Sequence, residues 1–384
     1  MKQKRTLLIS VLTICIAISL VFLPSCAKGK KSEEASAIKI GAILPLTGNL
    51  AQTGVPEMNA MKLALNKIIS KDSDIKMRIN FYDFKGIPNE AISLFRKAVN
   101  IDGCQIIFAS TSLSVNTLLP LVKEKKDKVI FFTITTQKDV IVSDNVFRVW
   151  PDVTQEMQIL SDYFNNQNGD IVLYYATNQL GMDAYNLFKI NIREKQRIVA
   201  EEGHSLDVHD FKNLLLKTSI KLNKKTEDKI LLAWTYPKQT IGALKAVSDL
   251  NIKFKNIVTS IGTNYPEVLD FIKNLKQKPF FVIPKYDMDL QNNTGISFDE
   301  EYFINYKEHS SWNSAFAYDN IMFLYEGIRN FVNNEWEISE LISSLENTEI
   351  DGVTGKIKMM KNHQAKVSLI LVTLDEEGKF IASE

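Results

Sequence analysis

Three short segments of the chain are rich in small and hydroxyl side chains, and each of them follows an apolar run. The segments are residues 45–54, 110–114 and 133–137. At the start of a helix, a serine or threonine hydroxyl and the free backbone N–H groups can all donate hydrogen bonds to a carboxylate. N-capping uses the same residue types and is the commoner role for any single one of them. Three such segments at one edge of a sheet favour a shared pocket for a small polar ligand.

Patterns that would indicate catalysis or a bound metal are missing from the sequence. The four histidines, at positions 204, 209, 309 and 363, are scattered, and His204 and His209 have no partner at metal-ligand spacing. The sequence contains neither a Gly-x-Ser-x-Gly elbow nor a P-loop. We therefore predict a protein that is not an enzyme and that carries no metal or cofactor.

The apolar pattern predicts the elements that would position these segments. Short β-rich runs alternate with amphipathic helical stretches, which is typical of parallel sheets covered by helices on both faces. We expect strands at 38–44, 76–82, 105–109, 128–134, 170–175, 229–234, 256–260 and 279–283. We expect helices at 57–69, 89–99, 115–124, 152–165, 183–201, 240–250 and 266–275. The fold class is therefore α/β, with two doubly wound parallel-sheet lobes.

The alternation breaks after Pro284. Two helical stretches follow, at residues 311–332 and 338–345. After them the apolar pattern predicts an antiparallel pair of strands at 355–359 and 366–374.

The carboxyl ends of the expected strands identify candidate ligand contacts, because open parallel sheets bind ligands at that edge. Loops of the first lobe contribute hydroxyl groups, and loops of the second lobe contribute aromatic and polar side chains. The candidates are Ser110, Ser112, Thr135 and Thr136 in the first lobe, and Asn178, Trp234, Tyr236 and Ser260 in the second.

The first 26 residues predict export from the cytoplasm. Basic residues at positions 2, 4 and 5 precede an apolar run over residues 7–23, and Cys26 follows at the expected cleavage edge. This arrangement resembles the lipobox of bacterial lipoproteins, in which Cys26 would receive the lipid. We expect residues 1–25 to be a signal peptide and 26–37 a flexible tether. The alternative is an uncleaved transmembrane anchor, for which the run is near the lower length limit.

Charge and cysteine content narrow the possible partners. The formal net charge is +1, which argues against nucleic acid as the main partner.

The roughly 350 residues after Cys26 suggest two domains. Cys104 is the one thiol left for the folded body, so it cannot form an intramolecular disulfide, and we expect it to be buried.

Several segments together resemble the branched-chain amino-acid-binding (leucine/isoleucine/valine) family of periplasmic binding proteins. The opening segment, IKIGAILPLTGNLAQTGVPEMNAM from Ile38 onward, carries the family's first strand and its Pro-x-Thr-Gly loop. Further matches follow in the same order as in the family. They are Val146-Phe147-Arg148 with Pro151-Asp152, Ala317-Tyr318-Asp319, and Gly352-Val353-Thr354-Gly355.

The resemblance implies a type I periplasmic binding protein whose lobes are joined by a three-pass hinge. Lobe 1 would comprise residues 38–153 and 284–350, and lobe 2 residues 154–283 and 351–384. Such a protein captures a small polar ligand, an amino acid or a related carboxylate or amide, by lobe closure for an ABC permease. It would be a monomer outside the cytoplasm, held at the membrane through lipidated Cys26.

The resemblance also assigns roles to some of the candidates. Ser112 and the pair Thr135-Thr136 would hold the ligand carboxylate, and Tyr236 would close over the ligand. In amino-acid binders an acid that pairs with the ligand amine would follow Val258, whereas residues 260–264 contain none. A ligand-sensing lipoprotein of the same fold without a transport partner, or an extracytoplasmic enzyme, is the alternative.

Overall fold

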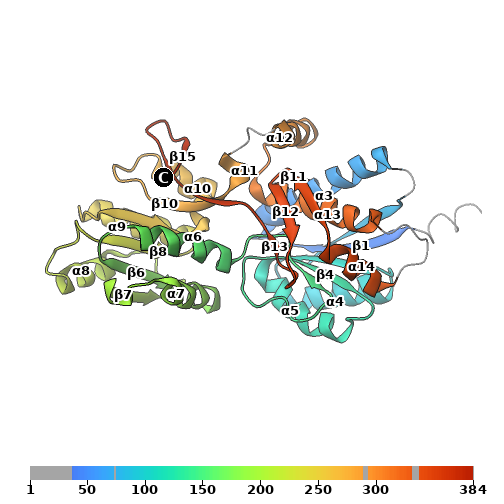
Figure 1. The fold of residues 1–384 in the computed structure, drawn as a ribbon, viewed down its shortest axis with the longest axis horizontal. Coiled ribbons are helices and arrows are strands. Elements are labelled where there is room, and N and C mark those ends of the chain that lie inside the picture. Colours follow the sequence, from blue (N-terminus) through green and yellow to red (C-terminus); the bar gives the residue numbers. More distant parts are fainter. Residues whose placement is uncertain (1–36, 73–74, 289–292, 331–336, 384) are drawn as a thin grey trace, which may run out of the picture. The chain divides into compact units, whose positions relative to one another are not determined.

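The computed structural model describes residues 37–72, 75–288, 293–330 and 337–383 (Figure 1). The predicted signal peptide, Cys26 and nearly all of the tether lie outside the described residues. No helix in the described ranges is long and apolar enough to cross a bilayer.

The first lobe is built on a five-stranded parallel sheet in the order β2-β1-β3-β4-β5. The bounds of its strands are β1 Ile38–Leu44, β2 Met77–Asp83, β3 Ile106–Ser110, β4 Ile130–Ile134 and β5 Val146–Phe147. Every residue of β3 and β4 is buried, because helices cover both faces of the sheet.

Two apolar cores lie on the two faces of this sheet. One core contains side chains of α4 (Pro88–Asn100) and α5 (Thr111–Glu124). The other contains side chains of α3 (Ala51–Lys71), α13 (Trp312–Arg329) and α14 (Ile338–Glu346), and also of α12 (Asn293–Tyr306). The first lobe therefore needs residues from both ends of the chain.

The second lobe is built on a seven-stranded sheet in the order β15-β14-β10-β9-β8-β6-β7. The strands are β6 Ile171–Ala176, β7 Ile198–His204, β8 Ile230–Trp234, β9 Asn256–Thr259, β10 Phe280–Pro284, β14 Leu369–Leu374 and β15 Phe380–Ala382. The first five are parallel, and β14 and β15 add an antiparallel edge.

Helices cover both faces of the second sheet as well. One face packs against α6 (Val153–Asn166) and α7 (Gln179–Asn191). The other packs against α8 (Lys212–Lys221), α9 (Pro237–Asp249) and α10 (Pro266–Ile272). The chain passes between the two sheets three times, after β5, after β10 and before β14, which confirms the doubly wound α/β fold expected from the sequence.

The C-terminal part of the chain is divided differently from the expected boundary at residue 351. Strands β11 (Glu349–Gly352), β12 (Gly355–Met359) and β13 (Ala365–Lys366) form a separate antiparallel sheet. Its side chains at positions 353, 357, 359 and 365 belong to a core of the first lobe. Only β14 and β15 join the second sheet, so the expected strand at 366–374 is divided between two sheets.

The expected helix at 183–201 is also wrong in its second half. Helix α7 ends at Asn191, and residues from Ile198 form β7, which pairs in parallel with β6. Ile198 and Val199 are β-branched residues, which fit the pleated surface of a strand, and an edge position beside β6 is available to them.

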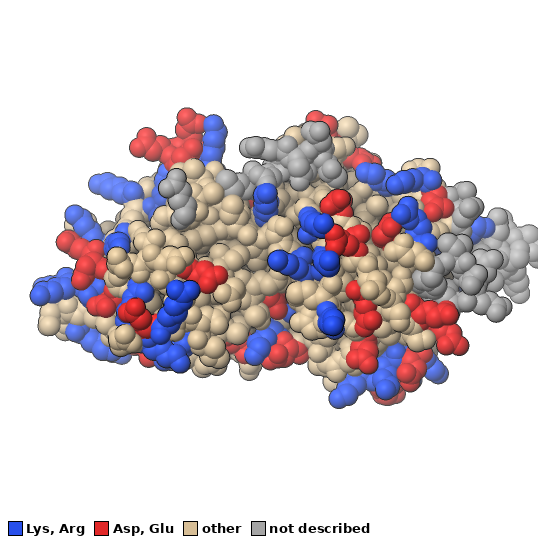
Figure 2. Space-filling view, in the orientation of Figure 1, with Lys and Arg blue, Asp and Glu red and all other residues tan. Residues whose placement is uncertain are grey.

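The surface carries both signs of charge side by side. On the face drawn in Figure 2, lysine and arginine side chains alternate with aspartate and glutamate over both lobes. This face offers no broad basic area of the kind that binds nucleic acid.

Candidate functional site

A cavity of about 130 Å³ lies at the carboxyl ends of the parallel strands. The loops after β4, β6, β8 and β9 contribute to it, together with α6 and the start of α13. Its lining residues are Thr136, Glu156, Leu180, Trp234, Thr235, Tyr236, Pro237, Ser260, Ile261, Gly262, Tyr265 and Trp312. This is the edge at which open parallel sheets bind ligands.

Four of the eight candidate contacts line this cavity, namely Thr136, Trp234, Tyr236 and Ser260. Asn178 lies directly behind them, because its Nδ2 donates a hydrogen bond of 2.7 Å to the Tyr236 hydroxyl. Asn178 also caps α7, since its Oδ1 accepts from the backbone N–H of Gly181. The second-lobe candidates therefore line or adjoin this cavity, and their contact with a ligand stays a prediction.

The other three candidates do not line the cavity. Ser112 is exposed in the first turn of α5, and the Thr135 hydroxyl accepts a hydrogen bond from the backbone N–H of Gln137. The Ser110 hydroxyl donates to Glu57 Oε1 at 3.0 Å. The carboxylate-binding role that the resemblance gave to Ser112 and Thr135 stays a prediction.

Sequence reasoning missed Glu156, which is the one carboxyl group in the lining. Its Oε1 accepts hydrogen bonds from Trp234 Nε1 at 3.1 Å and from the backbone N–H of Ile261 at 2.7 Å. Burial raises the pKa of Glu156 to about 7, although these two hydrogen bonds act to lower it. Glu156 lies one turn before Leu160 on the apolar face of α6, and this position in the helical pattern could have indicated its burial.

Glu156 contacts the loop after β9, in which the sequence contains no acid. The segment Ser260–Asn264 follows β9 and contains no carboxylate of its own, but its Ile261 binds the carboxylate of Glu156. The backbone N–H of Val153, at the start of the same helix, donates to the carbonyl of Thr136. Helix α6 therefore brings a carboxyl group to the loops that line the cavity.

A second buried carboxyl group, Glu57 on α3, lies near the same cavity. Burial raises its pKa to about 8, although the hydrogen bond from Ser110 acts in the opposite direction. Its Oε2 is buried without a hydrogen-bond partner among the described residues. Burial raises the pKa of the cavity residue Tyr265, and the negative charges of Glu57 and Glu267 raise it further.

Backbone strain occurs beside Glu57. Thr111 follows Ser110 and has a φ of 75°, in the left-handed region that non-glycine residues rarely adopt. Its hydroxyl is buried and has no partner among the described residues. Strained residues cluster at ligand sites, so the end of β3 has a feature of a binding loop although its residues do not line the cavity.

The matched Phe-Arg and Pro-x-Asp segments make contacts within the fold. Arg148 is buried, forms an ion pair of 2.7 Å with Asp152, and donates to Gln364 and to the carbonyl of Gln137. Burial lowers the pKa of Arg148, while Asp152 and Asp139 act to raise it. Arg148 therefore ties the loop after β4 to the residues just before β13.

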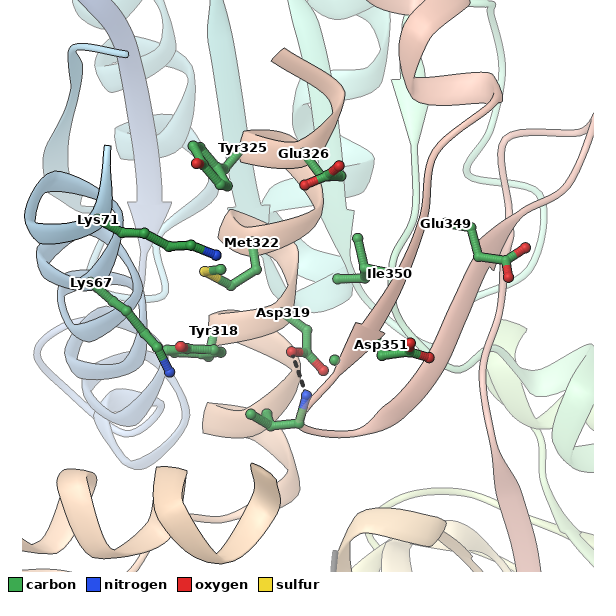
Figure 3. A pocket seen from close by; sticks show the side chains of 12 residues that line it. Lys67, Lys71, Tyr318, Asp319, Met322, Tyr325, Glu326, Glu349, Ile350 and Asp351 are labelled. Carbon is green, nitrogen blue, oxygen red and sulfur yellow. Dashed lines mark hydrogen bonds between the residues drawn. The ribbon is translucent and has the colours of Figure 1, made fainter. Parts of the chain in front are cut away.

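A larger cavity, of about 340 Å³, lies between α3, α13 and β11 (Figure 3). Asp319 at its wall accepts hydrogen bonds from the backbone N–H groups of Val353 and Thr354. A β-carbon at Gly352 would lie 2.6 Å from Asp319 Cγ, so only glycine fits there. The Ala-Tyr-Asp and Gly-x-x-Gly motifs thus fasten the β11–β12 turn to α13. Because this cavity lies away from the strand ends, we do not assign it the ligand.

Comparisons with known proteins agree with this architecture. A sequence model described as periplasmic binding protein matches residues 37–379. The substrate-binding protein LivJ of the branched-chain amino acid transporter from Streptococcus pneumoniae, solved with isoleucine, is 19% identical. It aligns with a TM-score of 0.73 over 91% of this chain and 99% of its own.

Two further solved structures are similar at the same level. A leucine-, isoleucine-, valine-, threonine- and alanine-binding protein from Brucella ovis is 18% identical, with a TM-score of 0.75 over 90% of this chain and 92% of its own. A solute-binding protein from R. palustris in complex with benzoate is 16% identical. It aligns with a TM-score of 0.73 over 90% of this chain and 95% of its own. A search of curated proteins finds no match. The family model covers most of the sequence, and the chain belongs to the periplasmic binding protein family.

Proposed function

We propose that the chain captures a small polar solute outside the cytoplasm and delivers it to an ABC permease. The solute would be an amino acid or a related carboxylate or amide. The observation that carries the proposal is the cavity at the strand ends, whose lining comes from both lobes. Thr136 and Trp312 belong to the first lobe, and Trp234, Tyr236 and Ser260 to the second. A ligand that contacts both lobes favours the closed state over the open one.

The proposal includes the membrane anchor. Cleavage before Cys26 and lipidation of its thiol would hold a monomeric binding protein beside the permease, with residues 26–37 as the tether. The support for this is the order of charged, apolar and small residues before Cys26. A permanent lipid attachment keeps the local concentration of the binding protein at the permease high.

Ligand capture is tested by thermal unfolding of the full chain, purified in detergent, against amino acids, amides, small carboxylates and aromatic acids. A ligand at about 100 times its Kd adds about 2.7 kcal/mol to the free energy of unfolding, so the melting temperature rises. We expect Thr136→Ala to reduce this rise more than Ser112→Ala, because Ser112 is exposed and lies outside the lining. If no compound in the panel raises the melting temperature, the proposal of solute capture fails.

Cys26→Ala should release the protein from the membrane fraction and prevent incorporation of labelled fatty acid. Cell fractionation followed by immunoblotting measures the first effect, and metabolic labelling the second. Cys104→Ala is the matched control, because Cys104 is buried in the folded body and should leave both results unchanged. A Cys26→Ala protein that remained in the membrane fraction would support an uncleaved transmembrane anchor instead.

A further inference from the structure

Aromatic side chains form much of the cavity wall. Trp234, Tyr236, Tyr265 and Trp312 are four of its twelve lining residues, and they come from both lobes. The faces of aromatic rings attract cations, and boxes of such rings recognise methylated ammonium groups. A volume of about 130 Å³ is close to the cavity of about 150 Å³ that accommodates benzene, so one compact group fits.

The charge of the lining favours a cation over an anion. Glu156 is the only carboxylate among the twelve described lining residues, and none of the twelve is lysine or arginine. A ligand carboxylate placed here would face the carboxyl group of Glu156 with no lysine or arginine in the lining to compensate it. A buried charge is stabilised when it is paired, so a positively charged ligand group would complement Glu156.

The hydrogen bonds of the lining hold its polar side chains in place around the cavity. Glu156 Oε1 accepts two hydrogen bonds, which fix the carboxyl group in place and leave the acceptor sites of its second oxygen unused by these two donors. The Tyr236 hydroxyl accepts from Asn178, and the Ser260 hydroxyl donates to the Thr235 carbonyl at 2.6 Å. A methylated ammonium group requires charge and contact with ring faces, and the four aromatic lining residues and the Glu156 carboxyl group can supply both.

The first-lobe loop after β3 does not supply a basic side chain for a ligand carboxylate. The Ser110 hydroxyl is bound to Glu57, and the second oxygen of that carboxyl is buried without a partner among the described residues. Both lobes therefore place carboxyl groups at or near the cavity.

We propose that this cavity binds the methylated ammonium group of a small solute between its four aromatic side chains and beside Glu156. This inference rests on the proposed function and narrows its ligand class. In this arrangement Trp234 and Ile261 fix the carboxylate in place through their hydrogen bonds. Closure of the lobes would then bring Trp312 and Thr136 against the same group.

Isothermal titration calorimetry on the full chain in detergent tests the inference with choline, glycine betaine and tetramethylammonium. The decisive control ligand is 3,3-dimethylbutanol, which has the shape of choline without its charge. We expect at least one of the methylated ammonium probes to bind, and choline to bind at least about tenfold more tightly than its neutral counterpart. Leucine, isoleucine and benzoate are titrated in parallel.

Variants assign the effect to named residues. Glu156→Gln keeps the volume and an oxygen that accepts from Trp234 and Ile261, and should weaken choline binding about tenfold or more while leaving 3,3-dimethylbutanol unaffected. Trp312→Leu should weaken all methylated ammonium probes. Asp162→Asn, at an exposed position on the same helix, is the matched control and should change nothing. Circular dichroism melts check that each variant is folded.

The outcomes separate this inference from the proposed function. If leucine, isoleucine or benzoate binds and the ammonium probes do not, the inference is overturned and solute capture stands. If 3,3-dimethylbutanol binds as tightly as choline, the cavity selects shape and not charge, and the inference is again overturned. If none of these compounds binds and no compound of the thermal panel raises the melting temperature, both proposals are overturned.

Discussion

Replacing Glu57 with glutamine should remove a large part of the pH dependence of folding stability. Burial raises the pKa of Glu57 from 4.5 to about 8, so the folded state binds a proton that the unfolded state releases between these values. The free energy of unfolding therefore decreases as pH rises from about 4.5 to about 8. Each pKa unit corresponds to about 1.4 kcal/mol, so the expected effect amounts to several kcal/mol by pH 8.

Urea unfolding of wild type and Glu57→Gln at several pH values between 5 and 8.5 measures this effect. The variant should lose less stability than wild type over that range. Some decrease should remain, because burial also raises the pKa of Glu156 to about 7 and that of Asp287 to about 7. Glu90→Gln, at an exposed position on α4, is the control and should follow the wild-type curve. Parallel curves for wild type and Glu57→Gln would show that Glu57 does not titrate in this range.

Gly181→Ala should destabilise the second lobe severely. A β-carbon at this position would lie 2.7 Å from the carbonyl carbon of Ala176 and 2.8 Å from its β-carbon. These are atoms at the end of β6, where neither the backbone nor the short alanine side chain can move aside. Forcing extra volume into a packed site costs about 1–3 kcal/mol, and contacts with backbone place this site at the upper end.

The measurement is the free energy of unfolding, followed by ligand binding, because Leu180 beside this glycine lines the cavity. Asn186→Ala on the exposed face of the same helix is the control and should remain within about 0.5 kcal/mol of wild type. Gly54→Ala in the first lobe should behave like Gly181→Ala, since its β-carbon would lie 2.8 Å from the carbonyl carbon of Pro45. A stability close to wild type for Gly181→Ala would mean that β6 and α7 can separate at low cost.

The sequence predicted most of the sheet architecture because the central strands are buried on both faces. Runs such as Ile106–Ser110 and Ile130–Ile134 consist of apolar or small residues throughout. Where such runs alternate with helical segments, a strand buried on both faces is the assignment that fits them. Strand β7 was missed because it is an edge strand of half-buried, partly charged residues that continue directly from a helical pattern. Its identity depends on the empty place beside β6, which is a property of the tertiary structure.

The sequence predicted residues that line the cavity where the position of a residue in the chain determines its place. It did not predict them where the direction of the side chain decides. Residues that directly follow a strand, such as Trp234, Tyr236 and Ser260, reach the strand ends whatever the details of packing. Ser112 lies in a helix turn, where a shift of one residue moves a side chain from the cavity to solvent. Glu156 was missed because a charged residue in a helix is usually solvated, and only the three-dimensional structure shows its burial.

The three crossings of the chain between its sheets also determine the order in which the lobes can be completed. A core of the first lobe includes side chains from α3 and from α13, and the five parallel strands of the second lobe lie between these two helices in the sequence. In a chain that leaves the ribosome or a translocation channel N-terminus first, α3 exposes its apolar face until α13 has emerged. The central strands of the second lobe, between residues 171 and 284, are by contrast continuous in sequence. The lobe that is encoded second is therefore nearly complete first, and during synthesis the unfinished first lobe is the part most exposed to proteases and most dependent on chaperones.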